Sequence, residues 1–191
     1  LAGADFSMSS DNDLSVHSWR ALLMQSAPGA EKLQPGLFVE LEDEISVLET
    51  QWPVHLPTGI IHADLFPDNV FFSFGKLSGL IDFYFACTDM LAYDIAICLN
   101  AWCFDANGSF NYERSRILWA AYSGLRPLSL AEKKAMPILA RGAATRFLLT
   151  RLFDWLNTPQ DAFVNKKDPI EYRKKLRFHQ SVNEVSDYGF D

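Results

Sequence analysis

Residues 62–69 read His62-Ala63-Asp64-Leu65-Phe66-Pro67-Asp68-Asn69, and residues 80–83 read Leu80-Ile81-Asp82-Phe83. The two stretches decide the fold because each lies next to an expected strand. A short apolar strand is predicted at 59–62, and segments 70–74 and 77–83 have the pattern of two more strands joined by a turn at Gly75-Lys76. Antiparallel pairing of the last two strands is expected to bring Asn69 and Asp82 side by side.

The rest of the chain is predicted to be helical, which makes the fold class mainly α with a small β-hairpin. A first helix is expected from Leu14 until Pro28-Gly29, and a second from Pro35-Gly36 until Pro53. Further helices are predicted over 90–102, after a cap at Asn111, from the capping-box sequence at Ser129 to Trp155 with a break or kink near Pro137, and after Asp168-Pro169. No internal repeat or linker divides the sequence, so one domain over residues 1–191 is expected.

Composition argues against several classes of protein. The net charge is -7 and the pI about 5.0, and no long basic run is present, so no nucleic-acid partner is expected. No apolar run approaches the roughly 20 residues of a membrane span, so no membrane partner is expected either. The cysteines Cys87, Cys98 and Cys103 lack metal-binding spacing and are interpreted as reduced core thiols of a cytoplasmic protein.

Three polar side chains of the opening stretches have the chemistry that phosphoryl transfer requires. Asp64 is expected on a loop stiffened by Pro67, where a carboxylate can orient a hydroxyl group and accept its proton. The amide oxygen of Asn69 and the carboxylate of Asp82 are ligands that Mg²⁺ prefers, with ATP phosphates completing the shell. Their order and spacing resemble the catalytic loop and the metal-binding aspartate of protein kinases.

Two further residues are predicted to support this loop. His62 is expected to hydrogen-bond the loop backbone rather than to take part in the chemistry. Asp94 lies one turn into an otherwise apolar helix, so its carboxylate needs donors, and the backbone amides of the 62–69 loop are expected to supply them. Asp89 is expected to cap the same helix.

The segments 61–70 and 79–83 together resemble the aminoglycoside phosphotransferase and choline kinase-like superfamily. The later segments 83–89, 93–104 and 146–159 are similar to the bacterial homoserine kinases of that fold. The resemblance covers nearly the whole chain. It implies that residues 1–191 form the C-terminal catalytic lobe of a protein kinase-like α+β fold.

The resemblance also implies a reaction. The chain would take part in the ATP-dependent phosphorylation of the side-chain hydroxyl of L-homoserine, which gives O-phosphohomoserine for threonine biosynthesis. In that reading Asp64 is the catalytic base, and Asn69 and Asp82 are the magnesium ligands.

One part of the family's pattern is missing from this sequence. No Gly-x-Gly occurs, and no lysine precedes Lys32, which lies on a predicted helix. The nucleotide-gripping N-terminal lobe of the same protein is therefore expected as a partner, and the isolated chain is expected to be inactive or weakly active.

An amino-acid acceptor carries a carboxylate, which a guanidinium group can bind as a bidentate fork. Arg141 and Arg146 lie on the long helix that should border the cleft, and either could serve. The alternative for each is an ion pair with one of the 24 acidic residues.

Two other functions remain open from the sequence. One is a related kinase acting on an aminoglycoside, choline or a sugar, and the other is a pseudokinase-like binding module. The presence of Asp64, Asn69 and Asp82 together favours a working enzyme.

Overall fold

The computed structural model describes residues 10–159 and 166–190. The helices are α1 (Val16–Leu33), α2 (Leu37–Gln51), α3 (Leu91–Trp102), α4 (Tyr112–Leu125), α5 (Leu130–Asn157) and α6 (Pro169–Gln180). The strands are β1 (Thr58–Ile61), β2 (Val70–Ser73), β3 (Lys76–Leu80) and β4 (Cys87–Met90). The mainly helical architecture and the hairpin formed by β2 and β3 confirm the predicted fold class.

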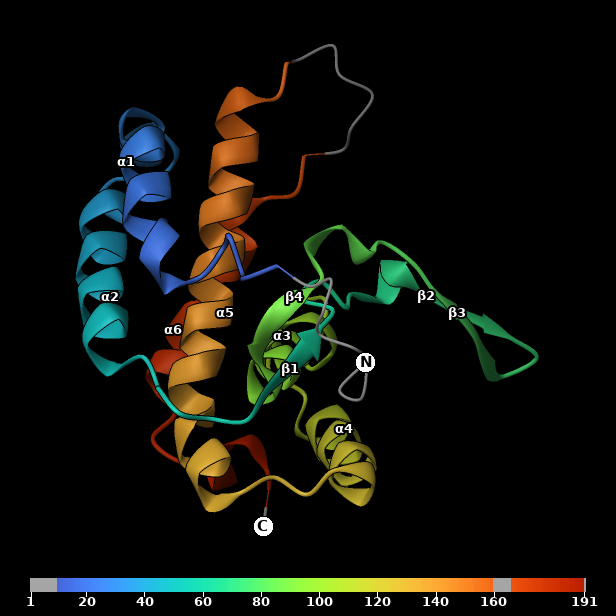
Figure 1. Cartoon of the computed structure of the whole chain (residues 1–191). Coiled ribbons are helices and arrows are strands. Elements are labelled where there is room, and N and C mark those ends of the chain that lie inside the picture. The colour runs from blue at the N-terminus through green and yellow to red at the C-terminus, as the bar shows by residue number, and fades with distance from the viewer. Residues whose placement is uncertain (1–9, 160–165, 191) are drawn as a thin grey trace.

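Helix α5 is the centre of the structure. It runs between α1 and α2 on one side and the β1–β4 pair with α3 on the other, while the β2–β3 hairpin projects away from the helical body (Figure 1). Its start is fixed by the predicted capping box, in which Ser129 and Glu132 satisfy each other's backbone donors. Many of its side chains between Met136 and Leu152 are buried, so the helix forms much of the core.

Gly142 on α5 allows the Trp52 ring to pack directly against the helix backbone. A Cβ added at Gly142 would lie 2.2 Å from the ring of Trp52, which leaves no room for any other residue. The Trp52 ring packs edge-on against Trp19 and Tyr93, with ring centroids 5.2 and 5.5 Å away. These contacts of Trp52 join α1, α3 and α5.

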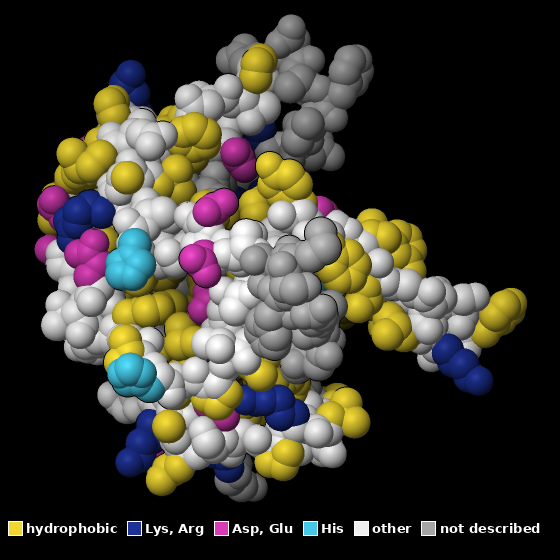
Figure 2. Space-filling model, in the orientation of Figure 1, with side chains coloured by type: hydrophobic (Ala, Val, Ile, Leu, Met, Phe, Trp, Pro, Cys, Tyr) yellow, Lys and Arg dark blue, Asp and Glu magenta, His cyan; other side chains and the backbone are white. Residues whose placement is uncertain are grey.

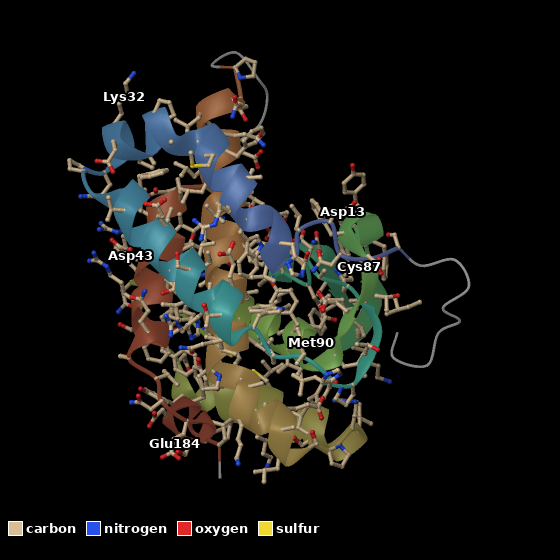
Figure 3. All side chains as sticks on the ribbon, turned by 60° about the vertical axis from the view of Figure 1, so that its left-hand side comes forward. Asp13, Lys32, Asp43, Cys87, Met90 and Glu184 are labelled. Atoms are coloured by element: carbon tan, nitrogen blue, oxygen red, sulfur yellow. The ribbon has the colours of Figure 1, made fainter. Side chains whose placement is uncertain are left out.

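The second sheet contains a strand that the sequence pattern does not reveal. β4 pairs antiparallel with β1, placing Cys87 opposite Ile61, and its ends at Cys87 and Met90 are marked in Figure 3. The prediction that Asp89 caps α3 is wrong, since Met90 occupies the N-cap position. The Asp89 carboxylate instead accepts hydrogen bonds from the Asn12 side chain at 2.7 Å and from the Met90 backbone N–H at 2.6 Å.

Helices α1 and α5 both continue past a proline at which the sequence predicted an end or a distortion. The first helix does not end at Pro28-Gly29 but continues to Leu33, because Gly29 packs against the side chain of Leu156 on α5. That tertiary contact outweighs the local cost of a proline inside a helix. Helix α5 continues through Pro137, so the break allowed for in the sequence is absent, and the alternative of a kink stays a prediction.

Cys87, Cys98 and Cys103 are buried free thiols, as predicted. None of the helices within residues 10–159 and 166–190 is long and apolar enough to cross a membrane.

A buried polar network ties α6 to α3 and to the C-terminal segment. The Asn100 amide nitrogen donates to the carbonyls of Ala96 and Ala140, so its oxygen is the acceptor for His179 Nε2 at 3.1 Å. His179 Nδ1 is then the acceptor for the Tyr188 hydroxyl at 2.8 Å. The imidazole is therefore neutral in the folded state. Burial, with the nearby charges of Lys175 and Arg141, lowers the pKa of His179 to about 3.

This network predicts a pH dependence of stability. An unfolded histidine titrates near pH ~6.5, so between about pH 6.5 and pH 3 the unfolded state binds a proton that folded His179 does not. The free energy of unfolding should therefore fall as the pH falls, with this one group contributing up to about 1.4 kcal/mol per pH unit. The free energy of unfolding, measured by urea denaturation over a pH series, should change less steeply with pH in His179→Gln than in the wild type. The exposed His17→Gln variant is the control, and equal slopes in all three proteins would contradict this account.

Candidate active site

The loop between β1 and β2 begins with a backbone conformation that L-residues rarely adopt. Ala63 is fully buried and has φ of 60°, in the left-handed region. The Asp94 carboxylate accepts hydrogen bonds from the backbone N–H groups of His62 and Ala63 at 3.1 and 2.9 Å. Asp94 thus meets the backbone donors predicted for it. Burial raises the pKa of the Asp94 carboxyl, and these two N–H donors counteract the rise.

The carbonyl side of Ala63 is held from a different helix. Arg146, on α5, donates a hydrogen bond from Nη1 to the Ala63 carbonyl oxygen, and its side chain is almost completely buried. The guanidinium group lies over the ring of Phe147, with 4.6 Å between Cζ and the ring centroid. Asp64 follows directly after this doubly held residue.

Asn69 lies beside Asp64 at the end of a single 3₁₀ turn, Pro67–Asn69. Its amide nitrogen donates to the Asp64 backbone carbonyl at 2.8 Å and lies 3.4 Å from the Asp64 carboxylate. Since the nitrogen faces Asp64, the amide oxygen of Asn69 is left to meet a ligand. Burial raises the pKa of the Asp64 carboxyl, while the charge of Arg146 opposes the rise and that of Asp82 adds to it.

The hairpin brings Asp82 to the same place. The Ile81 backbone N–H donates to the Asn69 carbonyl at 3.1 Å, and His62 Nε2 bonds to the Ile81 carbonyl at 3.0 Å. His62 therefore ties the start of the loop to the residue before Asp82, a backbone contact of the kind predicted for it. Asp82 itself is exposed and has φ of 62°, a second left-handed residue. No ion pair involves its carboxylate among the described residues.

One cavity of about 210 Å³ unites these groups. Asp64, Asn69, Asp82 and Arg146 all line it, together with four residues that the sequence analysis did not identify: Thr150, Arg151, Asp154 and Lys167. The three from α5 recur with Arg146 at helical spacing, so one face of the helix forms a wall. That spacing was visible in the sequence, but which face of α5 meets the loop was not.

Arg141 is not brought to this cavity. Its guanidinium group makes two hydrogen bonds to Glu44 on α2, at 2.9 and 2.7 Å. Glu44 is buried, so its carboxylate requires a paired cation, and Arg141 supplies it. The expectation that Arg141 borders the cleft is corrected, and the ion-pair alternative describes its position.

The candidate ligands for Mg²⁺ are one amide oxygen and one carboxylate. Within residues 10–159 and 166–190 no cluster of three or more histidine, cysteine or acidic side chains could hold a metal by itself. The Asn69 oxygen and the Asp82 carboxylate nevertheless suit an ion that keeps several waters and is bound by few protein oxygens together with phosphates. The site therefore fits a cation that arrives with its substrate.

Known proteins resemble this chain in sequence. A family model described as "Phosphotransferase enzyme family" matches residues 6–128. Homoserine kinases from Xanthobacter autotrophicus and Brucella anthropi are 60% and 55% identical to the chain over 189 and 191 residues, which is 99% and 100% of its length. The chain spans 59% of the length of each of these relatives.

Solved structures share the fold. The ethanolamine kinase of Plasmodium vivax matches with a TM-score of 0.65 at 18% identity, covering 96% of this chain and 52% of that one. The choline kinase of Cryptosporidium parvum matches with a TM-score of 0.62 at 15% identity, covering 93% and 59%. At such identities the likeness establishes a kinase-like fold and nothing finer.

The Asp94 contacts predict a loss of stability on substitution. In Asp94→Asn the side chain keeps one acceptor oxygen for two N–H donors and turns an NH₂ group toward one of them. The free energy of unfolding should fall by about 2 kcal/mol, the scale of a lost hydrogen bond to a charged group. Urea denaturation measures it. Asp43→Asn on the exposed face of α2 is the control, with a change of at most ~0.5 kcal/mol, and equal effects from both variants would contradict the assignment.

Proposed function

We propose that this chain, which belongs to the phosphotransferase enzyme family, carries the catalytic groups of a kinase that transfers the γ-phosphoryl group of ATP to the side-chain hydroxyl of L-homoserine. The observation that carries this proposal is the convergence of Asp64, Asn69 and Asp82 on one cavity. The choice of homoserine rests on relatives of 55–60% identity that bear the name homoserine kinase. The product would be O-phosphohomoserine, an intermediate of threonine biosynthesis.

Asp64 is the proposed base. Its carboxylate would orient the acceptor hydroxyl toward the γ-phosphorus and take its proton as the new O–P bond forms. Burial raises the pKa of the Asp64 carboxyl toward neutral pH, and the higher pKa makes its carboxylate a better proton acceptor. Its position depends on the backbone at Ala63 and on the contact with Asn69.

Asn69 and Asp82 are the proposed magnesium ligands. When bound, Mg²⁺ neutralises the charge on the nucleotide phosphates as the phosphoryl group is transferred. The Asn69 side chain is oriented by its hydrogen bond to the Asp64 carbonyl, so the positions of base and ligand are coupled. Asp82 is presented by the last residues of the hairpin, next to Asn69.

A nucleotide-gripping lobe in the same protein is part of the proposal. Lys32 points outward at the end of α1, so it is not directed at the cavity (Figure 3). The projecting hairpin carries exposed apolar side chains, among them Phe71, Phe72 and Leu77 (Figure 2). Exposed apolar surface of this kind is typical of a face that meets another protein segment. The proposed segment is the nucleotide-binding lobe of the longer protein, which would complete the site.

A panel of acceptors separates this proposal from its alternatives. The protein in its natural full length is assayed with ATP and Mg²⁺ against homoserine, choline, ethanolamine and an aminoglycoside. Phosphorylation of homoserine with the highest kcat/KM supports the proposal, and loss of turnover on chelation of Mg²⁺ supports the metal role. Preference for another acceptor identifies a related kinase. Nucleotide binding without turnover of any acceptor identifies a binding module.

Asp64→Asn tests the base directly. The amide retains the shape of the side chain but cannot accept the proton, so kcat should fall by about 10²- to 10⁴-fold. Binding of ATP, measured by calorimetry, should remain because the proposed metal ligands are intact. Glu49→Gln, which removes one partner of the surface pair with Arg20, is the activity control. Retention of wild-type kcat by Asp64→Asn would exclude Asp64 as the base.

A further inference from the structure

Arg146 differs from the other buried or half-buried arginines of the described structure. Arg126, Arg141, Arg151 and Arg173 each form an ion pair with a glutamate. Arg146 is 1% exposed, and no carboxylate lies within ion-pair distance of it in the described part of the chain. A buried cation without a paired anion is costly, so the other contacts of Arg146 must offset that cost.

Arg146 donates its hydrogen bond to the backbone carbonyl of the residue directly before Asp64. Nη1 donates to the carbonyl oxygen of Ala63, and Asp94 accepts from the N–H of the same residue. These two contacts restrain the peptide groups on either side of Ala63 and so fix its φ and ψ. Asp64 is the next residue, and the direction of its carboxylate follows from that backbone.

The guanidinium group is held in place by aromatic rings. Its Cζ atom lies 4.6 Å from the ring centroid of Phe147 on α5 and 5.5 Å from that of Phe85. Phe85 belongs to the 3₁₀ turn Phe83–Phe85 that begins directly after Asp82. Arg146 therefore contacts both the segment before the base and the segment after the metal ligand.

The same geometry disfavours a carboxylate clamp for the acceptor. Arg146 Nε is buried and has no hydrogen-bond partner in the described structure. The edge of the guanidinium group that includes Nε is therefore closed to a ligand, and one of the two Nη1 hydrogens is engaged by Ala63, which leaves few N–H groups for a second partner. A bidentate fork toward a substrate carboxylate needs two free N–H groups on one edge.

We propose that Arg146 is a positioning residue for Asp64: it fixes the Ala63 carbonyl and places its unpaired charge beside the base, and it does not bind the carboxylate of the acceptor. The inference rests on the proposed phosphoryl transfer for its catalytic meaning. The contact with Ala63 and the effect of the charge on Asp64 are independent of the acceptor. The charge of Arg146 lowers the pKa of Asp64 against the rise that burial causes.

The test compares Arg146→Met and Arg146→Lys with Arg20→Met in the full-length protein. Arg20 pairs with Glu49 on the surface and serves as the matched control. In Arg146→Met, kcat should fall by about 100-fold because the base is displaced, while the homoserine KM should stay within about threefold of the wild type. Arg146→Lys keeps the charge and should restore part of the lost kcat.

A second measurement needs no turnover. The NMR chemical shift of the Ala63 carbonyl carbon, which reports the hydrogen bond from Arg146, should differ from the wild type in Arg146→Met and differ less in Arg146→Lys. If Arg146→Met does not fold, the comparison is made with Arg146→Lys, in which kcat should fall without a rise in KM. A tenfold or larger rise in homoserine KM with unchanged kcat, or an unchanged Ala63 carbonyl shift in Arg146→Met, would overturn the proposal. An inactive wild type would count against the proposed function alone, since the Ala63 shift still decides the role of Arg146.

Discussion

The left-handed conformation of Ala63 is the constraint on which the site depends. A left-handed L-residue costs roughly 1–2 kcal/mol relative to its preferred conformations. Asp94 and Arg146 each supply a charged hydrogen bond to this region, and such bonds contribute about 1.5–3 kcal/mol apiece. The two contacts together are large enough to hold the strained conformation. Both come from helices that the chain reaches only after the hairpin, so the loop acquires its shape when the tertiary fold forms.

The rest of the site is built outward from this residue. Asn69 bonds back to the Asp64 carbonyl, His62 bonds to the Ile81 carbonyl, and the Ile81 N–H bonds to Asn69. These contacts connect the base, one proposed metal ligand and the residue before the other through backbone groups. A displacement at Ala63 is therefore transmitted to Asp64 first and to Asn69 next. The β2–β3 hairpin is stable in this role because its base is tied to the loop, even though its tip projects from the body.

The parts of the site that are local in sequence were predictable. Strand 59–62 and the hairpin follow from short apolar runs and turn signals, the spacing of Asp64, Asn69 and Asp82 is read directly from the sequence, and the structure has the strands within a few residues of the expected bounds. The need of Asp94 for backbone donors was also predictable, because a charged residue in an apolar helix must be satisfied. The caps at Asn111, Ser129 and Asp168 are present as predicted.

The predictions that failed depend on contacts between residues far apart in the sequence. β4 has no strand pattern and forms because β1 offers it a free edge, while α1 passes Pro28 because α5 packs against Gly29. Arg141 and Arg146 were equivalent in sequence, five residues apart on one helix, and only the packing of α2 and of the loop distinguishes them. The left-handed φ of Ala63 has no sequence signal, since alanine rarely adopts it.

The central claim is that Asp94 and Arg146 hold the same residue, and a double-mutant cycle tests it most directly. The free energy of unfolding is measured for the wild type, Asp94→Asn, Arg146→Met and the double variant. If both side chains act through Ala63, removing one releases the backbone that the other holds. The two losses should then fall short of additivity by on the order of 1 kcal/mol. Losses that add within about 0.3 kcal/mol would show that the two side chains act independently and would contradict the claim.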